Sequence, residues 1–427
     1  MNIVERGRAF LKQLQELGSR SVWDWKHCPH CGSWWTIKKG GYWRYPWGFG
    51  GRDSVRVQRH LCHECQKTYA ETSPLLVRGS WYYREVHRAA VDYWQHLGTS
   101  LRRTAEALRS WMGQQERWHL WRPLDTPTRS RCSLAASTVH RWLDGAGQRA
   151  VERVPEQLAG IGATQEMGTD GLWAKLKGGV VRVLLLAADS VSGLLYPPVV
   201  VRDEESASAW EKLFARAQAA GLDLQKLRGI CSDGAQGLLA YLRRELVWVL
   251  QQRCVWHIWR GLSGELARAV SQAAHGLAHA AAAALRDQVR AELVALIRGV
   301  VNAQHAEAAE IALAQLLAHP YGKALGQQLT NLMDRLLVYQ LDYCRGLQRV
   351  SPEWYWRDFR LRLSRGRNHR SEQRLERAAL LWAVYHNFEP AQWRSERKRH
   401  YRHPGQSALQ VTGVPPGPVS YLDALGV

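Results

Sequence analysis

Two pairs of cysteines with the same two-residue gap constrain the fold of this chain more than any other feature. The pairs are CPHC, with Cys28 and Cys31, and CHEC, with Cys62 and Cys65. A two-residue gap lets both thiolates of a pair reach one tetrahedral ion, and four thiolates complete its coordination. The sequence therefore predicts one structural Zn²⁺ ion held by these four cysteines.

The residues between the pairs alternate aromatic and basic side chains around glycine-rich turns. This pattern is typical of the short antiparallel strands of a zinc ribbon. Three nearby histidines, His30, His60 and His63, are alternative ligands. The aromatic rings can stack on bases while Lys and Arg contact phosphates, or they can wall a small zinc-dependent core, and the sequence leaves both interpretations open.

The next stretch, residues 81–143, has a helical pattern. Leu101, Ala105, Leu108 and Trp111 recur near helical spacing, and a shorter amphipathic segment follows. Together they resemble a helix-turn-helix with an enlarged loop, whose second helix would enter a major groove of DNA. A polar stretch containing glycine then predicts a linker and a domain boundary near residue 150. The candidate DNA-contacting residues of the second helix are Ser137, Thr138, His140 and Arg141.

The charge of the chain points to a polyanionic partner. There are 58 Lys and Arg against 38 Asp and Glu, a formal net charge of +20. Basic side chains that neutralise phosphates release counterions, so a nucleic acid is the expected partner. The sequence lacks the apolar run of about 18 residues that a transmembrane helix needs, and its start lacks the apolar core of a signal peptide. We expect a cytoplasmic protein with no membrane partner.

Two aspartates stand beside apolar segments in the second half of the chain. The order is a short segment ending at Asp170, two apolar runs around a turn, a helix from about residue 206 to 220, and a fourth strand ending at Asp233. In a ribonuclease H-like α/β fold, this order makes the first and fourth strands neighbours. Asp170 and Asp233 would then face each other.

Two adjacent carboxylates repel unless a divalent cation lies between them, and oxygen ligands suit Mg²⁺ or Mn²⁺. Two such ions about 4 Å apart support in-line phosphoryl displacement, the chemistry of nucleases and of polynucleotide transfer. A turn interpretation also exists for Asp170 and Asp233, because each precedes a glycine. We interpret the other acids of this region as turn or capping residues. They are Asp189, Asp203, Glu204 and Glu205.

Three motifs together resemble the Mutator-like DDE transposases of bacterial insertion sequences. They are TDG with Asp170, SDGAQGL with Asp233, and CVWH from Cys254 to His257. An N-terminal zinc ribbon and a helix-turn-helix frequently accompany such enzymes. The resemblance implies a ribonuclease H-like catalytic domain with an α-helical insertion, metal-dependent DNA strand cleavage and strand transfer, and a place for His257 near the active site.

The resemblance also implies a third acid, a glutamate that starts a basic helix beyond the insertion. Glu353 begins such a segment and is our choice, although the Asn-x-x-Glu lead-in of similar transposases is missing. Glu372, at the head of the next helix, is the alternative, and Glu376 is a more distant one. The implied ligands of two Mg²⁺ or Mn²⁺ ions are Asp170, Asp233 and Glu353.

Residues 357–403 are more basic than the rest of the chain, with thirteen Lys or Arg and five Asp or Glu. We expect this stretch to follow a phosphate backbone near the acids. The tail after it is rich in Gly and Pro, which predicts an extended arm. The candidate DNA contacts of the stretch are Arg357, Arg360, Arg397, Lys398 and Arg399.

These predictions give an organisation in six parts. They are an N-terminal helix and zinc ribbon (1–78), a helix-turn-helix-like region (79–150), the first part of the catalytic core (151–263), an α-helical insertion (264–345), the last part of the core (346–404) and an extended tail (405–427). The expected partner is double-stranded DNA, of the element ends and of the target, bound by a homodimer or larger assembly associated with the nucleoid. Two other functions remain open: a DNA-binding regulator without catalysis, and a structure-selective nuclease of the same fold.

Overall fold

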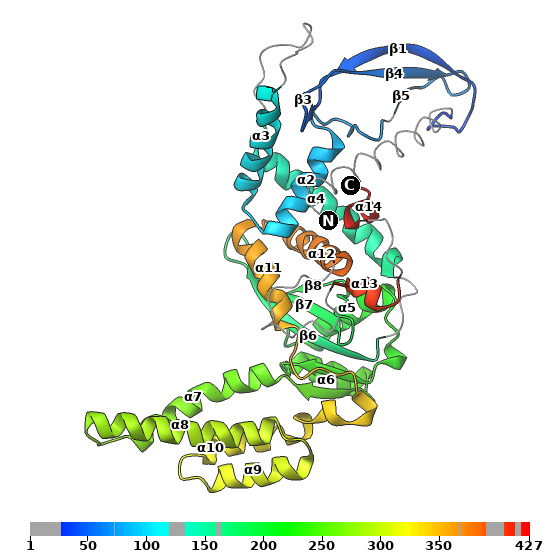
Figure 1. Ribbon diagram of the computed structural model, residues 1–427. Coiled ribbons are helices and arrows are strands. Elements are labelled where there is room, and N and C mark those ends of the chain that lie inside the picture. Colours follow the sequence, from blue (N-terminus) through cyan, green and yellow to red (C-terminus); the bar gives the residue numbers. More distant parts are fainter. Residues whose placement is uncertain are drawn as a thin grey trace. The chain divides into compact units, whose positions relative to one another are not determined.

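The computed structural model describes residues 27–71, 73–118, 133–158, 164–366, 369–389, 405–414 and 420–427 (Figure 1). The chain divides into two compact units, residues 1–146 with residue 427, and residues 147–426. Of the helices within the described ranges, none combines the length and the apolar content that a bilayer crossing requires.

The first unit begins with an antiparallel sheet of three strands in the order β1-β4-β5. β2 and β3 form a separate hairpin that contains the buried Trp47. The Trp47 N–H donates to the Trp81 carbonyl, and the Trp47 carbonyl accepts from the Tyr83 N–H. Short antiparallel strands that follow and precede the cysteine pairs are compatible with the predicted zinc ribbon. The strands are β1 (Thr36–Arg44), β2 (Trp47–Gly48), β3 (Gly51–Arg52), β4 (Val55–Cys62) and β5 (Thr68–Ala70).

Three helices follow the ribbon. Gly98, in the left-handed conformation with φ of 54°, ends the first and turns the chain into the second. The second helix buries Ala105, Leu108 and Met112. Trp111, which we expected on the buried face, is exposed, because the apolar stripe continues at Met112, four residues beyond Leu108. The helices are α2 (Arg84–Leu97), α3 (Leu101–Trp118) and α4 (Ala136–Leu158).

The linker predicted after residue 143 is wrong over residues 144–158, which continue α4. Four apolar residues of this stretch are buried at intervals of four, so one face of the helix packs continuously despite Gly145 and Gly147. Packing outweighs the low helix propensity of glycine here. The buried residues are Ala146, Ala150, Val154 and Leu158.

The second unit is built on a mixed sheet of five strands in the order β10-β9-β6-β7-β8. The first three strands in the chain pair antiparallel, and the later two join parallel to β6, so the first and fourth strands are neighbours as expected. The strand that carries Asp170 does not end there, because Asp170 and Gly171 remain paired with β7. The strands are β6 (Glu166–Lys175), β7 (Val181–Asp189), β8 (Val199–Val201), β9 (Gly229–Ser232) and β10 (Leu250–Arg253).

Helices cover both faces of this sheet. Alternate residues of β6 and β7 form one apolar cluster with α11 and α12, whose largest members include Trp356 and Trp382. The intervening residues of β7 are also buried, and α5 contacts this strand and buries Trp210 and Phe214. The helices are α5 (Ala207–Ala219), η2 (Leu224–Lys226), α6 (Gln236–Glu245), α11 (Glu353–Gly366) and α12 (Glu372–Phe388).

A helical region lies between β10 and α11 in the chain and has an apolar core of its own. Its two ends meet at one place: the Val255 N–H donates to the Arg349 carbonyl (2.9 Å), and the Ser351 N–H donates to Cys254 Sγ (3.2 Å). The elements are α7 (Val255–Ala273), α8 (His279–Val301), α9 (Ala306–Ala318), α10 (Lys323–Thr330), η3 (Met333–Arg335), η4 (Val338–Gln340) and η5 (Asp342–Cys344).

The predicted extended arm is wrong for the described parts of the tail, which form α13 (Ala408–Val411) and α14 (Tyr421–Ala424). Each short helix starts with a capping box, at Ser407 and at Ser420, and each contacts α12. Tyr421 is buried and packs its ring against Tyr385. The capping boxes and the buried apolar side chains stabilise these two helices despite the Gly and Pro content of the tail.

Candidate functional site

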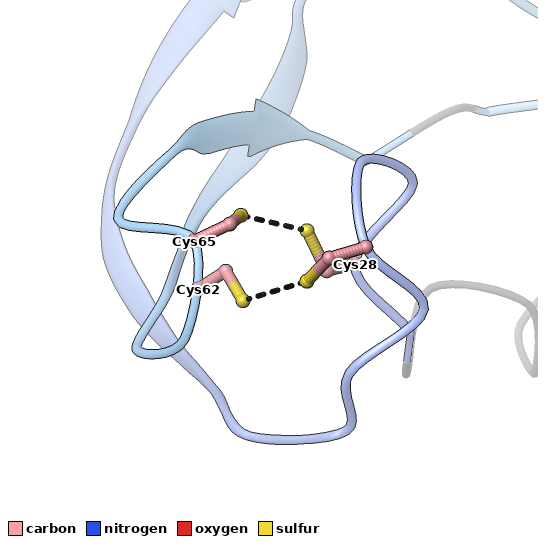
Figure 2. Close-up of side chains that lie close together, drawn as sticks. Cys28, Cys62 and Cys65 are labelled. Atoms are coloured by element: carbon pink, nitrogen blue, oxygen red, sulfur yellow. Dashed lines mark hydrogen bonds between the residues drawn. The ribbon is translucent and has the colours of Figure 1, made fainter.

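The four cysteines of the ribbon lie together. Cys28 Sγ is 3.6 Å from Cys65 Sγ, Cys31 Sγ is 3.5 Å from Cys62 Sγ, and all four sulfur atoms lie within 4.8 Å of one another (Figure 2). Four sulfurs bound tetrahedrally at about 2.3 Å from zinc would be roughly 3.8 Å apart. The cluster therefore fits one Zn²⁺ ion.

Two tight turns hold the sulfurs in place. In the first, the Gly32 N–H donates to the Cys28 carbonyl (2.8 Å), with φ of 75° at Gly32. In the second, the Gln66 N–H donates to the Cys62 carbonyl (3.0 Å). These turns bend each cysteine pair back on itself, as a zinc knuckle requires.

The alternative histidine ligands have other contacts. The buried His60 hydrogen bonds Glu71 (3.1 Å) and stacks on Tyr69, while His63 stacks on Trp35. The backbone N–H of His30 donates to Cys28 Sγ (3.4 Å), a contact that supports a negative sulfur. The metal-ligand cluster that the structure forms among the described residues of the ribbon contains the four cysteines and none of these imidazoles.

A second cluster lies in the sheet of the second unit. Ligand atoms of Asp170, Asp233 and His257 all lie within 4.8 Å of one another. Strand register explains the meeting of the two acids: Gly168 of β6 pairs with Cys231 of β9 in a parallel ladder, so Asp170 and Asp233, two positions further along, fall side by side. His257 comes from the first turn of α7, which begins where β10 ends.

Asp170 is buried, with 2% of its surface exposed. Burial raises the pKa of its carboxyl well above the usual value, and the carboxylates of Glu353 and Asp233 raise it further. Asp170 Oδ2 and His257 Nδ1 are buried and make no hydrogen bond among the described residues. Two unpartnered acceptors beside a second acid fit a divalent cation.

Glu353, our choice for the third acid, is the first residue of α11 and lies near Asp170, whose pKa it raises. Close packing places it there. Pro352 lies against Gly168 of β6, so closely that a Cβ on that glycine would be 2.8 Å from Pro352 Cδ. Glu353 Oε1 also accepts a hydrogen bond from Arg360 (2.8 Å).

Glu372, the alternative, lies elsewhere. It accepts a hydrogen bond from Arg182 Nε at 2.5 Å. Arg182 pairs with Ala174, four residues along β6 from Asp170. Glu376, the more distant alternative, pairs with Arg216. The structure thus brings Glu353, and neither of these two glutamates, near Asp170, but the cluster of ligand atoms within 4.8 Å of one another holds Asp170, Asp233 and His257 and does not include Glu353.

Sequence reasoning missed Glu204 as a neighbour of the acids. Its Oε1 accepts a hydrogen bond from the Trp173 indole (3.0 Å), and its Oε2 fills the space above Gly171, only 2.0 Å from where a Cβ would stand. Burial raises its pKa, and Asp233 raises it further. Asp203, by contrast, has the predicted turn role, since its Oδ1 accepts from the Glu205 N–H (3.1 Å) and the Ser206 N–H (3.0 Å) before α5 begins.

Cys254 of the CVWH motif is buried near Asp170. Hydrogen bonds, first with Cys231 and then with His257 and Ser351, lower the pKa of its thiol to about 3. The Ser351 N–H donates to Cys254 Sγ (3.2 Å), which ties the segment before Glu353 to the end of β10. Asp189 forms the predicted turn, because its Oδ1 accepts from the Val191 N–H (3.1 Å).

The candidate DNA-contacting residues are spread over three segments. In α4, Ser137 and Arg141 are exposed, Thr138 and His140 are half-buried, and Arg141 donates to Thr138 Oγ1 (3.3 Å). In α11, Arg357 is exposed and Arg360 binds Glu353. The remaining candidates, which lie outside the described residues, are Arg397, Lys398 and Arg399.

Comparison with known families agrees with this geometry. Residues 198–341, about a third of the chain, match the family described as "Transposase, Mutator family". The match includes Asp233 and His257, which belong to two of the three motifs, and it supports the predicted resemblance to Mutator-like transposases; the TDG motif with Asp170 lies outside the matched residues. Among curated proteins, none matches the chain.

Proposed function

From the Mutator-family match we propose that this chain is a transposase of the DDE type, which cleaves DNA strands and transfers them to a new site. The observation that carries the proposal is the meeting of Asp170, Asp233 and His257 around buried, unpartnered acceptor atoms. The order of the strands supports a ribonuclease H-like catalytic domain: three antiparallel strands, a helix, and a fourth strand that returns parallel to the first.

Asp170, Asp233 and Glu353 would hold two Mg²⁺ or Mn²⁺ ions, which when bound would supply positive charge for the reacting phosphate and lower the pKa of an attacking oxygen. The residues of the chain fix the geometry. The ladder between β6 and β9 sets the spacing of the aspartates, and the contact of Pro352 with Gly168 sets the position of Glu353. His257, in the first turn of α7 and close to both aspartates, would orient the scissile phosphate.

The proposed reaction has two in-line displacements on phosphorus. First, a water oxygen attacks the phosphodiester at the element end, the 3′-oxygen leaves with a proton, and a 5′-phosphate remains on the other fragment. Second, the freed 3′-hydroxyl attacks a phosphodiester of the target, whose own 3′-oxygen leaves. Both steps use one set of acids.

The rest of the chain would bind DNA. The proposal includes one structural Zn²⁺ ion on the four cysteines, contacts of α4 and of the basic stretch after Glu353 with double-stranded element ends and target, and a homodimer or larger assembly on DNA at the nucleoid. It is supported by the net charge of +20 and by the exposed Ser137 and Arg141 at the start of α4.

Isosteric substitution of the aspartates tests the catalytic proposal. We expect Asp170→Asn and Asp233→Asn each to abolish Mg²⁺-dependent cleavage and joining of element-end DNA, because an amide is a poor ligand for a hard cation, while affinity for DNA is kept. Asp342→Asn, at an exposed aspartate paired with Arg345, is the matched control. Full activity of either variant would reject the proposal, and wild-type cleavage without joining would indicate a nuclease. Binding with no cleavage of any DNA would indicate a regulator.

The third acid has its own test. We expect Glu353→Gln to lose cleavage and Glu372→Gln to retain it, because only Glu353 lies beside Asp170. Cleavage of a labelled element-end duplex, measured for both variants at saturating Mn²⁺, distinguishes them. The opposite pattern would assign the role to Glu372.

A further inference from the structure

The ribbon of the first unit carries a hollow of about 960 Å³. One wall is the sheet of β1, β4 and β5, and the other is the segment of residues 73–81 that leads to α2. A hollow of this size is large enough for an organic ligand. Its aromatic lining residues are Tyr42, Trp43, Tyr45, Tyr69 and Trp81.

The rings of this hollow are unusually open to solvent. Trp43 is 57% exposed, Trp81 is 68% exposed and Tyr42 is 44% exposed. Large rings exposed together around a concavity mark an interaction surface more often than a core. The buried aromatic residues of this region, among those that the structure describes, include Trp47 and Tyr82, so the small core does not depend on these three exposed rings.

The backbone segments that carry the rings are tied in place before any ligand arrives. Trp43 lies within the ladder between β1 and β4, opposite Arg56. The carbonyl of Trp81 accepts the Trp47 N–H (2.8 Å). Arg44 donates to the carbonyls of Val77 (3.1 Å) and Ser80, which ties the second wall to β1. A preorganised pair of walls loses little entropy on binding.

The charge around the hollow favours a polyanion. Residues 27–83 contain eight Lys or Arg and three Asp or Glu. Arg44, Arg78, His27 and His30 line the hollow, against one acid, Glu71. That acid faces His60, to which it hydrogen bonds. Rings that stack and basic groups that meet phosphates are the combination that binds single-stranded nucleic acid.

We infer that this hollow binds unpaired DNA, with bases stacked on Trp43 and Trp81. A duplex cannot occupy it in this way, because its base faces are covered by neighbouring base pairs. A role for unpaired DNA goes beyond the proposed cleavage and joining, and it does not require the acids of the second unit. The surface would hold a strand that is separated from its partner at the end of an element.

The test uses the zinc-loaded, full-length protein without Mg²⁺. A labelled oligothymidine and a duplex of mixed sequence are titrated in parallel. We expect Trp43→Ala with Trp81→Ala to weaken oligothymidine binding by at least about tenfold and duplex binding much less, since stacking contributes substantially per base. Trp43→Phe with Trp81→Phe, which keeps both rings flat and apolar, should retain most of the affinity for oligothymidine.

Tyr343→Ala, at an exposed ring of the second unit, is the matched control and should leave both affinities unchanged. Zinc content of one ion per chain shows that each variant keeps its ribbon. Unchanged oligothymidine binding by the alanine variant, or an equal loss for single strand and duplex, would overturn the inference. Binding of a proline-rich peptide in the hollow, without displacement by oligothymidine, would also overturn the inference. Asp170→Asn should bind oligothymidine normally, so a failed catalytic proposal and a failed base-binding surface give different results.

Discussion

Asp170 is an acid in a place where an isolated charge is unfavourable. Its side chain is buried, Oδ2 has no hydrogen-bond partner within the described residues, and two further carboxylates lie nearby. Such a group either binds a proton or is neutralised by a cation. Without metal, the folded protein therefore holds a proton on Asp170 at a pH where the unfolded chain has lost it.

This linkage predicts how stability depends on pH. Because the folded-state pKa of Asp170 is raised, its favourable contribution is full below the unfolded value of about 3.9 and is lost as the pH rises through the folded value. We expect the metal-free second unit to lose thermal stability over this range. Asp170→Asn should make the Tm depend less steeply on pH. Each kcal/mol of destabilisation that the substitution removes should raise the Tm by about 3 °C.

Thermal unfolding followed from mildly acidic to neutral pH, with and without Mn²⁺, checks this. Mn²⁺ should raise the Tm of the wild type more at neutral than at acidic pH, and it should do so much less for Asp170→Asn. A wild-type Tm that rises with pH in the absence of metal, with the same slope in Asp170→Asn, would contradict the assignment. The exposed Asp342→Asn is again the control.

At the scale of elements, one contact controls the third acid. Gly168 of β6 has no side chain, and Pro352 occupies the space where one would be. We expect Gly168→Ala to displace the start of α11 by a few tenths of an ångström. Strand cleavage should fall by about tenfold or more, because small displacements of reacting groups are costly, while DNA affinity is kept.

Gly264→Ala gives the matched control, because a Cβ at Gly264 of α7 would meet no atom within 4 Å. Its cleavage rate should equal that of the wild type, and its helix should be slightly more stable. Equal cleavage rates for Gly168→Ala and Gly264→Ala, measured at saturating metal, would show that the contact does not position Glu353.

The same elements show what sequence could and could not predict. The meeting of Asp170 and Asp233 could be predicted, because apolar runs and turns gave the order of the strands, and in a ribonuclease H-like fold that order makes the first and fourth strands neighbours. The role of Glu204 could not be predicted, since it depends on empty space above Gly171 rather than on spacing in the chain. The tail and the end of α4 were predicted wrongly, because Gly and Pro content was given more weight than capping boxes and buried apolar residues.

At the scale of the whole molecule, the two units have different sources of stability. The ribbon has a small core and a cluster of four thiols, whereas the second unit packs helices on a five-stranded sheet. Structural zinc supplies about 10–16 kcal/mol of binding energy that small domains use to fold. Zinc removal should therefore affect the first unit alone.

Hydrogen exchange measured by mass spectrometry tests this expectation. A zinc-selective chelator should abolish protection in β1 and β4 and leave protection in β6 and β7 unchanged. Restored zinc should restore the ribbon. Loss of protection in both units would mean that they do not fold independently.

The two ends of the helical region are hydrogen bonded to each other, and this bears on how far the length of the region can vary. The chain leaves the sheet at Cys254 and returns at Ser351, and these two points are hydrogen bonded to each other. The positions of Asp233 and Glu353, which lie outside the segment, therefore need not change with the number of residues between the two points, and His257 lies only three residues after the first point. Since the entropy of closing a loop grows only slowly with its length, helices can be added or lost there at little cost. The segment is a module that can change in size while the acids stay in place.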